Sequence, residues 1–284
     1  MRTLFTSCDE LLKMFRVIAF FLLISALEAH SDPLSLRQSC LNSLKNYKSY
    51  FKDEVLDQVC EKALRTSECN SVKGEPIFHL DYPGVATKPK KILVLSLIHG
   101  DETHAGGLGR FWAERLNKVD ARNTWRIIPV ANPDGVKAKT RTNAEGVDLN
   151  RNFPTLDWTT DAQSFWKNEA HSTPRKFPGV AAGKEPEVRC LMQHLEDFKP
   201  DFVISIHTPL KVLDFDGPKL KPPSFSYLPW KSLGNFPGSL GRYLWVERKI
   251  PVLTTELRED LPVTATAFEQ LQDLIGTLIL TDLK

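Results

Sequence analysis

The stretch ILVLSLIHGDE, residues 92–102, decides the fold of this chain. Its first seven residues form a continuous apolar run broken only by Ser96, which is the pattern of a strand covered on both faces of a sheet. The run ends in His99, and Glu102 follows three residues later. The stretch therefore predicts a buried strand with two possible metal ligands at its end.

A second apolar run, residues 202–206, ends in His207 about a hundred residues later. Two imidazoles and one carboxylate can hold Zn²⁺ and leave its fourth position open for water. Zinc in an open site activates that water or polarises a carbonyl, so the trio favours hydrolysis over a structural metal. The trio alone does not decide this, because a His-x-x-Glu string occurs by chance and a strand-end histidine is often structural.

Strands alternate with helices from residue 76 onward, which predicts an α/β fold with a mostly parallel sheet between helical layers. His99, His207 and Glu256 lie at or near the ends of three predicted strands. Because functional residues in such sheets gather beyond the carboxyl ends of the strands, we expect these side chains to share a site. The expected strands are residues 77–80, 92–98, 125–130, 202–206 and 252–257, and the expected helices are residues 102–117, 186–198 and 264–280.

The N-terminus, residues 1–31, reads as an export signal. Lys13 and Arg16 precede an apolar stretch at residues 17–27, and a small-x-small cleavage pattern follows at residues 29–31. Met14 is an alternative start, and the competing interpretation is a buried N-terminal helix. The apolar stretch is short for a bilayer span. The pattern predicts a periplasmic or secreted protein with no stable membrane anchor after signal removal.

Residues 32–71 form a predicted helical N-terminal extension, and residues 72–284 form the predicted catalytic domain. Apolar residues recur at helical spacing in the extension, amid Lys, Asp and Glu. A propeptide, a lid and a packing extension all fit this pattern, and we prefer the packing extension. The net charge of +2 in 284 residues, with no long Lys/Arg run, argues against nucleic acid as a partner.

Four cysteines remain if the signal is removed, since Cys8 lies within it. In an oxidising compartment they can form two disulfides in three connectivities. A local pair, Cys40–Cys60 or Cys60–Cys69, fits their spacing. A zinc cluster fits less well, because no tight Cys-x-x-Cys pair is present. The fourth cysteine, Cys190, leaves the connectivity open.

Several ordered motifs give the chain a clear resemblance to a known family. They are HGDE at residues 99–102, NPDG at 132–135, TRTNAEGVDLNRNFP at 140–154, KEPE at 184–187 and PGSLG at 237–241. From about Gly74 to the C-terminus the chain resembles the carboxypeptidase A-like zinc metallopeptidases. Among these it looks most like the bacterial murein peptide amidase A group, which cleaves the γ-D-glutamyl–diaminopimelate amide of peptidoglycan peptides. The resemblance implies a mostly parallel, mixed and twisted sheet between helical layers.

The resemblance also implies a metal centre. It assigns His99, Glu102 and His207 as the ligands of one Zn²⁺ and Asp148 as the residue that orients His99. A zinc-bound histidine usually donates its other N–H to a carboxylate or carbonyl, which makes this role for Asp148 chemically sound. On residue chemistry alone, Asp148 reads equally well as an ordinary turn residue.

The remaining implied roles concern the substrate. Arg141 would polarise the scissile carbonyl and hold the developing oxyanion, while Asn150 and Arg151 would grip the terminal carboxylate. Glu256 would be the general base and acid. The role of Arg141 is chemically sound because a fixed cation stabilises charge that develops beside it. The role of Arg151 is sound because the guanidinium group can bind a carboxylate through two hydrogen bonds. Without the resemblance, the two arginines read equally well as solvated loop residues, and Glu256 as a surface carboxylate.

The chain departs from the digestive carboxypeptidases in one motif. Those enzymes carry a mobile tyrosine shortly before the Gly-Ser motif, whereas this chain has PWKSL at residues 229–233. Tyr227 and Tyr243 are weak substitutes, and Trp230 or Lys231 could line the pocket instead. Of the other histidines, we expect His79 in a strand and His194 on a solvated helix face.

The sequence predicts a periplasmic zinc-dependent peptidase or amidase that acts on peptidoglycan peptides or muropeptides. The expected bond is γ-D-Glu–diaminopimelate, hydrolysed by zinc-activated water with Glu256 as general base. One alternative is an N-acyl amino acid deacylase of the aspartoacylase or succinylglutamate desuccinylase type, and another is a D,L-carboxypeptidase of different bond specificity. A third is a non-catalytic peptidoglycan-binding module, which the complete set of ligands and Glu256 argue against.

Overall fold

The computed structural model describes residues 33–258 and 264–280. From Leu36 onward, the described residues belong to one compact unit. The predicted export signal, with its alternative start at Met14, lies outside the described residues. Within the described part of the chain, no helix has both the length and the apolar character needed to cross a membrane.

The elements follow the alternating order that the sequence predicts. The strands are β1 (Leu80–Tyr82), β2 (Lys91–Ser96), β3 (Thr124–Ile128), β4 (Phe202–His207), β5 (Val212–Asp216) and β6 (Val252–Glu256). The helices are α2 (Pro33–Leu44), α3 (Asp53–Cys60), α4 (Thr103–Leu116), α5 (Pro133–Ala138), α6 (Gln163–Asn168), α7 (Pro186–Phe198) and α8 (Ala265–Leu280). Short helical turns are η1 (Leu149–Arg151), η2 (Trp158–Ala162), η3 (Pro174–Lys176) and η4 (Arg242–Glu247).

The strands form one mixed sheet of six strands in the order β1-β3-β2-β4-β6-β5. The four central strands are parallel, while β1 and β5 pair antiparallel at the two edges. This confirms the mostly parallel, mixed sheet. The first strand is β1 at Leu80–Tyr82 rather than residues 77–80. Strand β5 is not among the strands that the sequence predicts.

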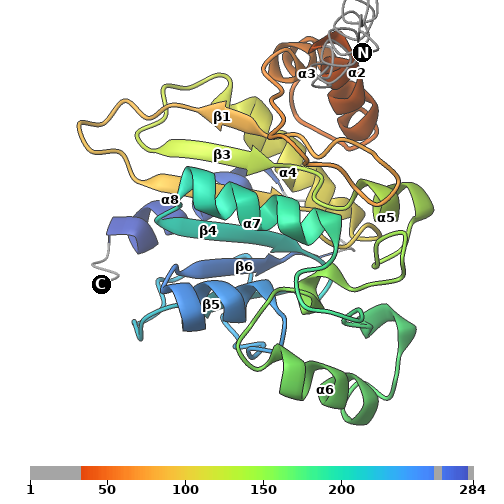
Figure 1. Cartoon of the computed structure of the whole chain (residues 1–284). Coiled ribbons are helices and arrows are strands. Elements are labelled where there is room, and N and C mark those ends of the chain that lie inside the picture. The colour runs from red at the N-terminus through yellow and green to blue at the C-terminus, as the bar shows by residue number, and fades with distance from the viewer. Residues whose placement is uncertain (1–32, 259–263, 281–284) are drawn as a thin grey trace, which may run out of the picture. The chain divides into compact units, whose positions relative to one another are not determined.

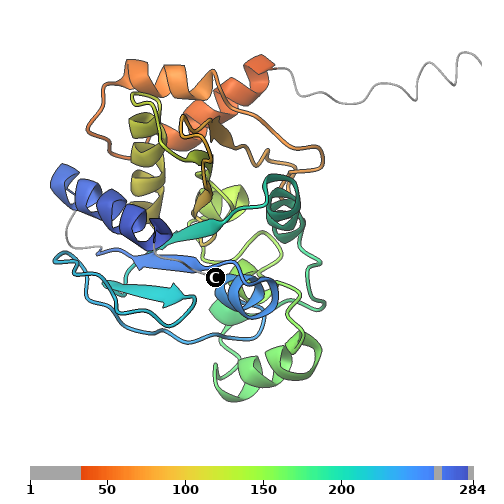
Figure 2. The same cartoon turned by 90° about the vertical axis from the view of Figure 1, so that its left-hand side faces the viewer.

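Helices cover both faces of the sheet (Figure 1). Ile92 and Val94 of β2 pack in the core cluster that holds apolar residues of α4 and α8. Leu93 and Leu95 point the other way, into the cluster built with α7. Both sets are needed because a strand alternates its side chains between the two faces. Figure 2 shows the same layers from the side.

The N-terminal helices pack on the same compact unit. Leu44 and Leu56 belong to a small buried cluster with Phe78, Leu97 and Val130. A Cys40–Cys60 disulfide joins α2 to α3. A second disulfide, Cys69–Cys190, ties the segment before β1 to α7. The Cys40–Cys60 pair is one of the two local pairs that the sequence offered, and the Cys60–Cys69 pair does not form.

The expectation that His194 is solvated is wrong. Its side chain is fully buried on the sheet-facing side of α7, with its ring centroid 4.8 Å from that of His79. Arg126 of β3 lies 3.3 Å from His194 Nδ1. Burial lowers the pKa of His194 to about 3, and His79 and Arg126 add to this effect. Burial and Arg126 lower the pKa of His79 to about 4 against the opposing charge of Asp81.

This histidine pair makes the fold sensitive to acid. The unfolded chain binds protons at these groups near their ordinary pKa of 6.5, whereas the folded chain binds them only near pH 4 and pH 3. The stabilisation is fully present above pH 6.5 and is lost as the pH falls towards 4. Each histidine lowers the free energy of unfolding by about 1.4 kcal/mol per pH unit within that window.

We therefore predict that His194→Gln makes the free energy of unfolding less dependent on pH between pH 6.5 and 5. The slope should fall by the equivalent of about one bound proton. Urea unfolding at several pH values measures the slope. The matched control is His171→Asn, since His171 is exposed and its positive φ of 51° suits asparagine. Identical slopes for wild type and His194→Gln would contradict the prediction.

Candidate metal centre

The loop between β2 and α4 carries His99 and Glu102, and its shape depends on close backbone packing. A Cβ on Gly100 would lie 2.0 Å from the carbonyl carbon of Gly135, so only glycine fits there. Asn132 holds the same region together. Its amide nitrogen donates to the Ile98 carbonyl at 3.2 Å, and its oxygen accepts from the Gly135 N–H at 2.9 Å. The NPDG motif thus caps α5 and fixes the loop that presents His99.

The three predicted ligands meet although 108 residues separate the two histidines. His99 Nδ1 lies 2.7 Å from Glu102 Oε1, and His207 Nδ1 lies 3.0 Å from Glu102 Oε2. The two Nδ1 atoms are 3.2 Å apart. All three side chains are buried and form one of the two possible metal-binding groups among the described residues. The other contains the disulfide-bonded Cys69 and Cys190.

The geometry suits a small cation. His99 Nε2 lies 3.2 Å from Asp148 Oδ1, and an ionised carboxylate only accepts, so this nitrogen carries a proton. His99 Nδ1 faces a carboxylate oxygen of Glu102 and Nδ1 of His207. These atoms repel one another unless a proton or a cation lies between them. Ligand atoms about 2.1 Å from a tetrahedral zinc lie about 3.4 Å apart, close to the observed spacings. His99, Glu102 and His207 therefore fit Zn²⁺.

Asp148 is the charged centre behind the ligands. Its side chain is fully buried, and besides His99 it accepts from Arg141 Nε at 3.0 Å and from the Asn150 N–H at 3.1 Å. Burial alone would raise its pKa, but Arg141 and His99 outweigh that effect and hold the pKa well below its usual range. The pKa of Glu102 is likewise lowered, because His99 and His207 outweigh its burial. Both carboxylates are therefore ionised at neutral pH.

Sheet pairing places the proposed base beside a ligand. His207 and Glu256 are register partners at the ends of the parallel strands β4 and β6. Glu256 is buried except at the cavity, and its Oε2 accepts from the Leu210 N–H at 3.2 Å. Ser205 lies two residues before His207 on the same strand face, with its Oγ 2.9 Å from His207 Nε2. No sequence motif singles out Ser205, although strand periodicity places it next to His207.

A cavity of about 450 Å³ opens over these groups. Arg141 reaches it beside Glu102, with an Nη1–Oε1 distance of 3.5 Å. Arg151 lies with its guanidinium 4.6 Å from the centroid of the Phe236 ring, and its buried Nε has no hydrogen-bond partner. Asn150 is held by the Leu240 N–H, which donates to its side-chain oxygen at 2.8 Å. All the predicted site residues except the deeper Asp148 line this cavity.

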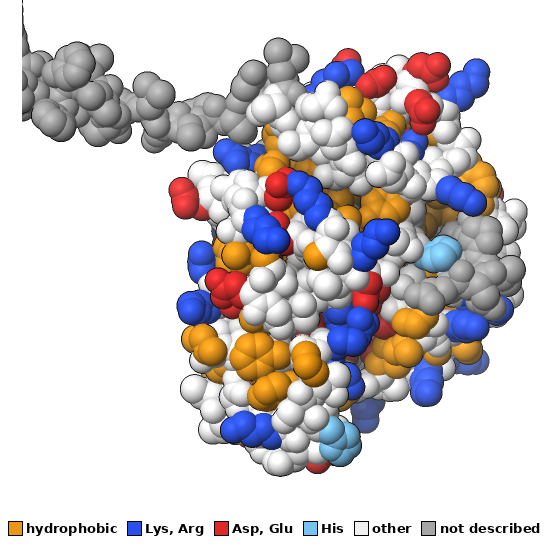
Figure 3. All heavy atoms as spheres, turned by 90° about the vertical axis from the view of Figure 1, so that its right-hand side faces the viewer, with side chains coloured by type: hydrophobic (Ala, Val, Ile, Leu, Met, Phe, Trp, Pro, Cys, Tyr) orange, Lys and Arg blue, Asp and Glu red, His pale blue; other side chains and the backbone are white. Residues whose placement is uncertain are grey.

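The cavity lies beyond the carboxyl ends of the parallel strands, as the sequence predicts for such sheets. Those strands run towards the side of the molecule that holds α5 and α6 (Figure 1). Figure 3 views the molecule from that side, where basic and acidic side chains lie close together near the centre of the face. The site therefore presents charges of both signs.

Four candidate lining residues lie elsewhere. Trp230 and Lys231 do not line the cavity, and the indole N–H of Trp230 donates to the Pro223 carbonyl at 2.7 Å. Tyr227 and Tyr243 also pack away from it. The cavity instead receives Asp214 and Asp216 from β5 and Phe236 from a loop. The alternation of Leu213 and Phe215 with the two aspartates is a signal that could have revealed β5.

Comparison with known proteins agrees with this geometry. Residues 69–216 match the zinc carboxypeptidase family. The chain belongs to that family. It is therefore a metallopeptidase, a hydrolase of the zinc-dependent kind.

Two curated relatives are murein peptide amidases A. The protein of Vibrio campbellii is 32% identical over 206 residues, which cover 68% of this chain and 78% of that protein. The protein of Escherichia coli is 31% identical over 146 residues, 51% of this chain and 59% of that protein. The match to the second relative thus spans about three fifths of its length.

Solved structures share the fold. The crystal structure of a murein-tripeptide amidase from Escherichia coli O157 has a TM-score of 0.54 and 24% identity, covering 75% of this chain and 90% of that one. Thrombin-activatable fibrinolysis inhibitor has a TM-score of 0.61 and 16% identity, covering 81% of this chain and 72% of that one. At these identities the two structures show the fold alone.

We predict that the purified protein binds about one zinc per chain and that His207→Ala removes it. Two remaining ligands bind zinc much more weakly than three. Glu256→Gln keeps all three ligands and therefore retains the metal. Metal content after gel filtration measures this directly. In addition, a chelator lowers the melting temperature of wild type and Glu256→Gln but not of His207→Ala. Equal zinc in His207→Ala and wild type would refute the ligand set.

Proposed function

We propose that the protein hydrolyses the amide before the C-terminal residue of peptidoglycan stem peptides, with γ-D-Glu–diaminopimelate as the bond. The observation that carries this is the convergence of three metal ligands, two arginines and a glutamate on one cavity. When bound, zinc would polarise the scissile carbonyl and make the attacking water more acidic. His99, Glu102 and His207 are the ligands.

Glu256 carries the proton in this proposal. Its carboxylate lies at the end of β6 in register with His207, so it reaches the space directly in front of the ligands. It takes a proton from the water whose oxygen bonds to the carbonyl carbon. It then gives that proton to the leaving nitrogen as the carbon–nitrogen bond breaks. The backbone N–H of Leu210 orients the carboxylate without blocking this exchange.

The two arginines bind charge at different points. Arg141 holds the developing oxyanion, and its position is fixed because Asp148 anchors its Nε. Arg151 takes the terminal carboxylate of the substrate. Its Nη1 donates to the Asn150 carbonyl at 2.6 Å, and the Phe236 ring supports its planar group. A guanidinium held in this way keeps a fork ready for bidentate recognition of a carboxylate.

The names of the two relatives support a peptidoglycan peptide as the substrate. Among the described residues, those that line the cavity include no tyrosine. With the predicted export signal, the enzyme would act in the periplasm on the sacculus or on fragments released from it. The two disulfides fit an oxidising compartment.

The proposal predicts that zinc-loaded protein releases diaminopimelate from L-Ala-γ-D-Glu-diaminopimelate. Glu256→Gln should lower kcat by about 10²–10⁴-fold while retaining zinc, because a general base contributes roughly that factor. Mass spectrometry of the products identifies the bond that is cut. Ordinary L-peptides serve as the comparison substrates. If zinc-replete wild type cleaves neither class, the proposed function is wrong.

Recognition by Arg151 predicts a dependence on the free terminal carboxylate. Converting that carboxylate to an amide should lower kcat/KM of wild type by about 30–200-fold, since charged hydrogen bonds contribute about 2–3 kcal/mol. Arg151→Gln should lose the same discrimination, so the acid and the amide become similar substrates. A variant that still prefers the acid as strongly as wild type would place carboxylate recognition elsewhere.

A further inference from the structure

The alternation of side chains along β2 breaks at Leu97, two residues before the ligand His99. In a strand, neighbouring side chains face opposite sides of the sheet. Ser96 faces α4, since its Oγ would lie 2.2 Å from a Cβ on Gly109 of that helix. Leu97 faces α4 as well, since its Cδ1 would lie 2.8 Å from a Cβ on Gly106. The chain therefore turns between β2 and the loop that carries His99.

The backbone of Leu97 makes this turn by entering the left-handed region, with a φ of 53°. That region is unfavourable for a residue with a bulky side chain, because its Cβ crowds the neighbouring carbonyl group. Such a conformation persists only where the surrounding structure holds it in place. It also decides the path of the loop, because an extended residue at this position would continue β2 in its original direction. Whatever holds Leu97 therefore positions His99.

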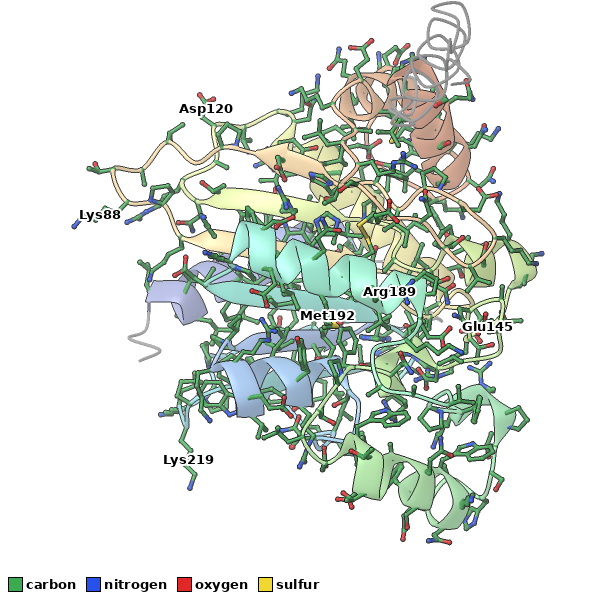
Figure 4. The ribbon with its side chains drawn as sticks, in the orientation of Figure 1. Lys88, Asp120, Glu145, Arg189, Met192 and Lys219 are labelled. Carbon is green, nitrogen blue, oxygen red and sulfur yellow. A yellow bond between two sulfur atoms is a disulfide. The ribbon has the colours of Figure 1, made fainter. Side chains whose placement is uncertain are left out.

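The N-terminal extension supplies the contacts that hold Leu97. The Leu97 side chain is fully buried in a cluster with Leu44 of α2 and Leu56 of α3. The ring of Tyr47, just after α2, packs at the same point of α4, since a Cβ on Gly106 would come within 2.6 Å of it. α2 and α3 lie on the side of the molecule that also holds α5, and side chains occupy the space between them and the sheet (Figure 4).

A buried ion pair fixes the extension to α4. Arg110 is 3% exposed, and its Nε donates to Glu114 Oε1 at 2.9 Å. Its Nη1 donates to three carbonyls at the end of α2 and just after it, among them that of Tyr47 at 2.8 Å. The Ser49 hydroxyl donates to Glu114. Removing the extension would take these acceptors from the guanidinium, so the contacts fit a permanent part of the fold better than a removable propeptide.

We propose that the N-terminal extension is a positioning element of the metal centre and that it acts through Leu97 as the positioning residue. The packing of α2 and α3 holds Leu97 in its left-handed conformation, and that conformation directs His99 towards Glu102 and His207. A weaker hold lets the backbone relax to the extended region, which moves His99 away from the other two ligands and weakens zinc binding. This proposal rests on the ligand set of the proposed function and not on the bond that is cleaved.

Two truncations of Leu97 separate positioning from packing. Leu97→Ala and Leu97→Gly leave nearly the same vacant space in the cluster, but only glycine adopts a left-handed φ without strain. The zinc dissociation constant of the full-length protein, measured by competition with a chelator, should rise about 10–100-fold in Leu97→Ala and stay within about 3-fold of wild type in Leu97→Gly. Equal zinc affinities of the two variants would overturn the proposal, because a role in packing alone affects both alike.

A truncation in the extension tests the other partner. Leu44→Ala removes a fully buried side chain of α2, and the matched control is Leu278→Ala, a fully buried leucine of α8 in a different cluster. Both should lower the melting temperature, but only Leu44→Ala should weaken zinc binding, by about 10-fold. Leu56→Val is the milder change in the same cluster and replaces Leu44→Ala if that variant does not fold. Equal zinc affinities of the extension variant and the control would refute a role for the extension.

A double variant links the two halves of the proposal. In the Leu97→Gly background, Leu44→Ala should leave the zinc affinity unchanged, because no strained residue remains to be held. A further loss of affinity in the double variant would mean that the extension acts by another route and would overturn the proposal. Wild type that binds zinc but cleaves no stem peptide refutes the hydrolytic function alone, whereas wild type that binds no zinc refutes the ligand set and this proposal with it.

Discussion

The buried carboxylate of Asp148 is the interaction on which the site depends. An ionised carboxylate without solvent contact is strongly unfavourable unless cations and N–H donors surround it. Arg141, His99 and the Asn150 N–H supply that environment. One buried charge therefore orients His99, Arg141 and the turn that presents Arg151. These parts of the site cannot shift independently.

The parallel sheet brings the remaining groups to the same point. Pairing of β2 with β4 and of β4 with β6 carries three strand ends to one edge, where His99, His207 and Glu256 meet. The apolar faces set the register. A slip of one residue in β4 would turn every side chain to the other face and move His207 away from Glu102, so the register of the sheet sets the geometry of the site. Burial of the strands on both faces thus fixes the positions of the side chains at their ends.

Much of this was readable in the sequence. The apolar runs predicted β2, β4 and β6 and hence the common edge, and ordered motifs predicted the residues that the cavity gathers. β5 was missed because its two aspartates break an apolar run, although Leu213 and Phe215 mark a period of two. His194 was misplaced because its polarity was weighed above the helical spacing it shares with Val188 and Leu191. The Cys69–Cys190 pair and the cavity walls depend on how distant loops fold together, which no local pattern records.

The residues that line the cavity come from central strands and from an edge strand of the sheet. His207 and Glu256 end the central strands β4 and β6, which have neighbours on both sides and little freedom to move. Asp214 and Asp216 come from β5, an edge strand paired only with β6. Side chains on an edge strand can change without disturbing the pairing that holds the metal ligands. The cavity therefore carries opposite charges in different parts. Arg141 and Arg151 lie near the predicted ligands, and Asp214 and Asp216 lie along β5.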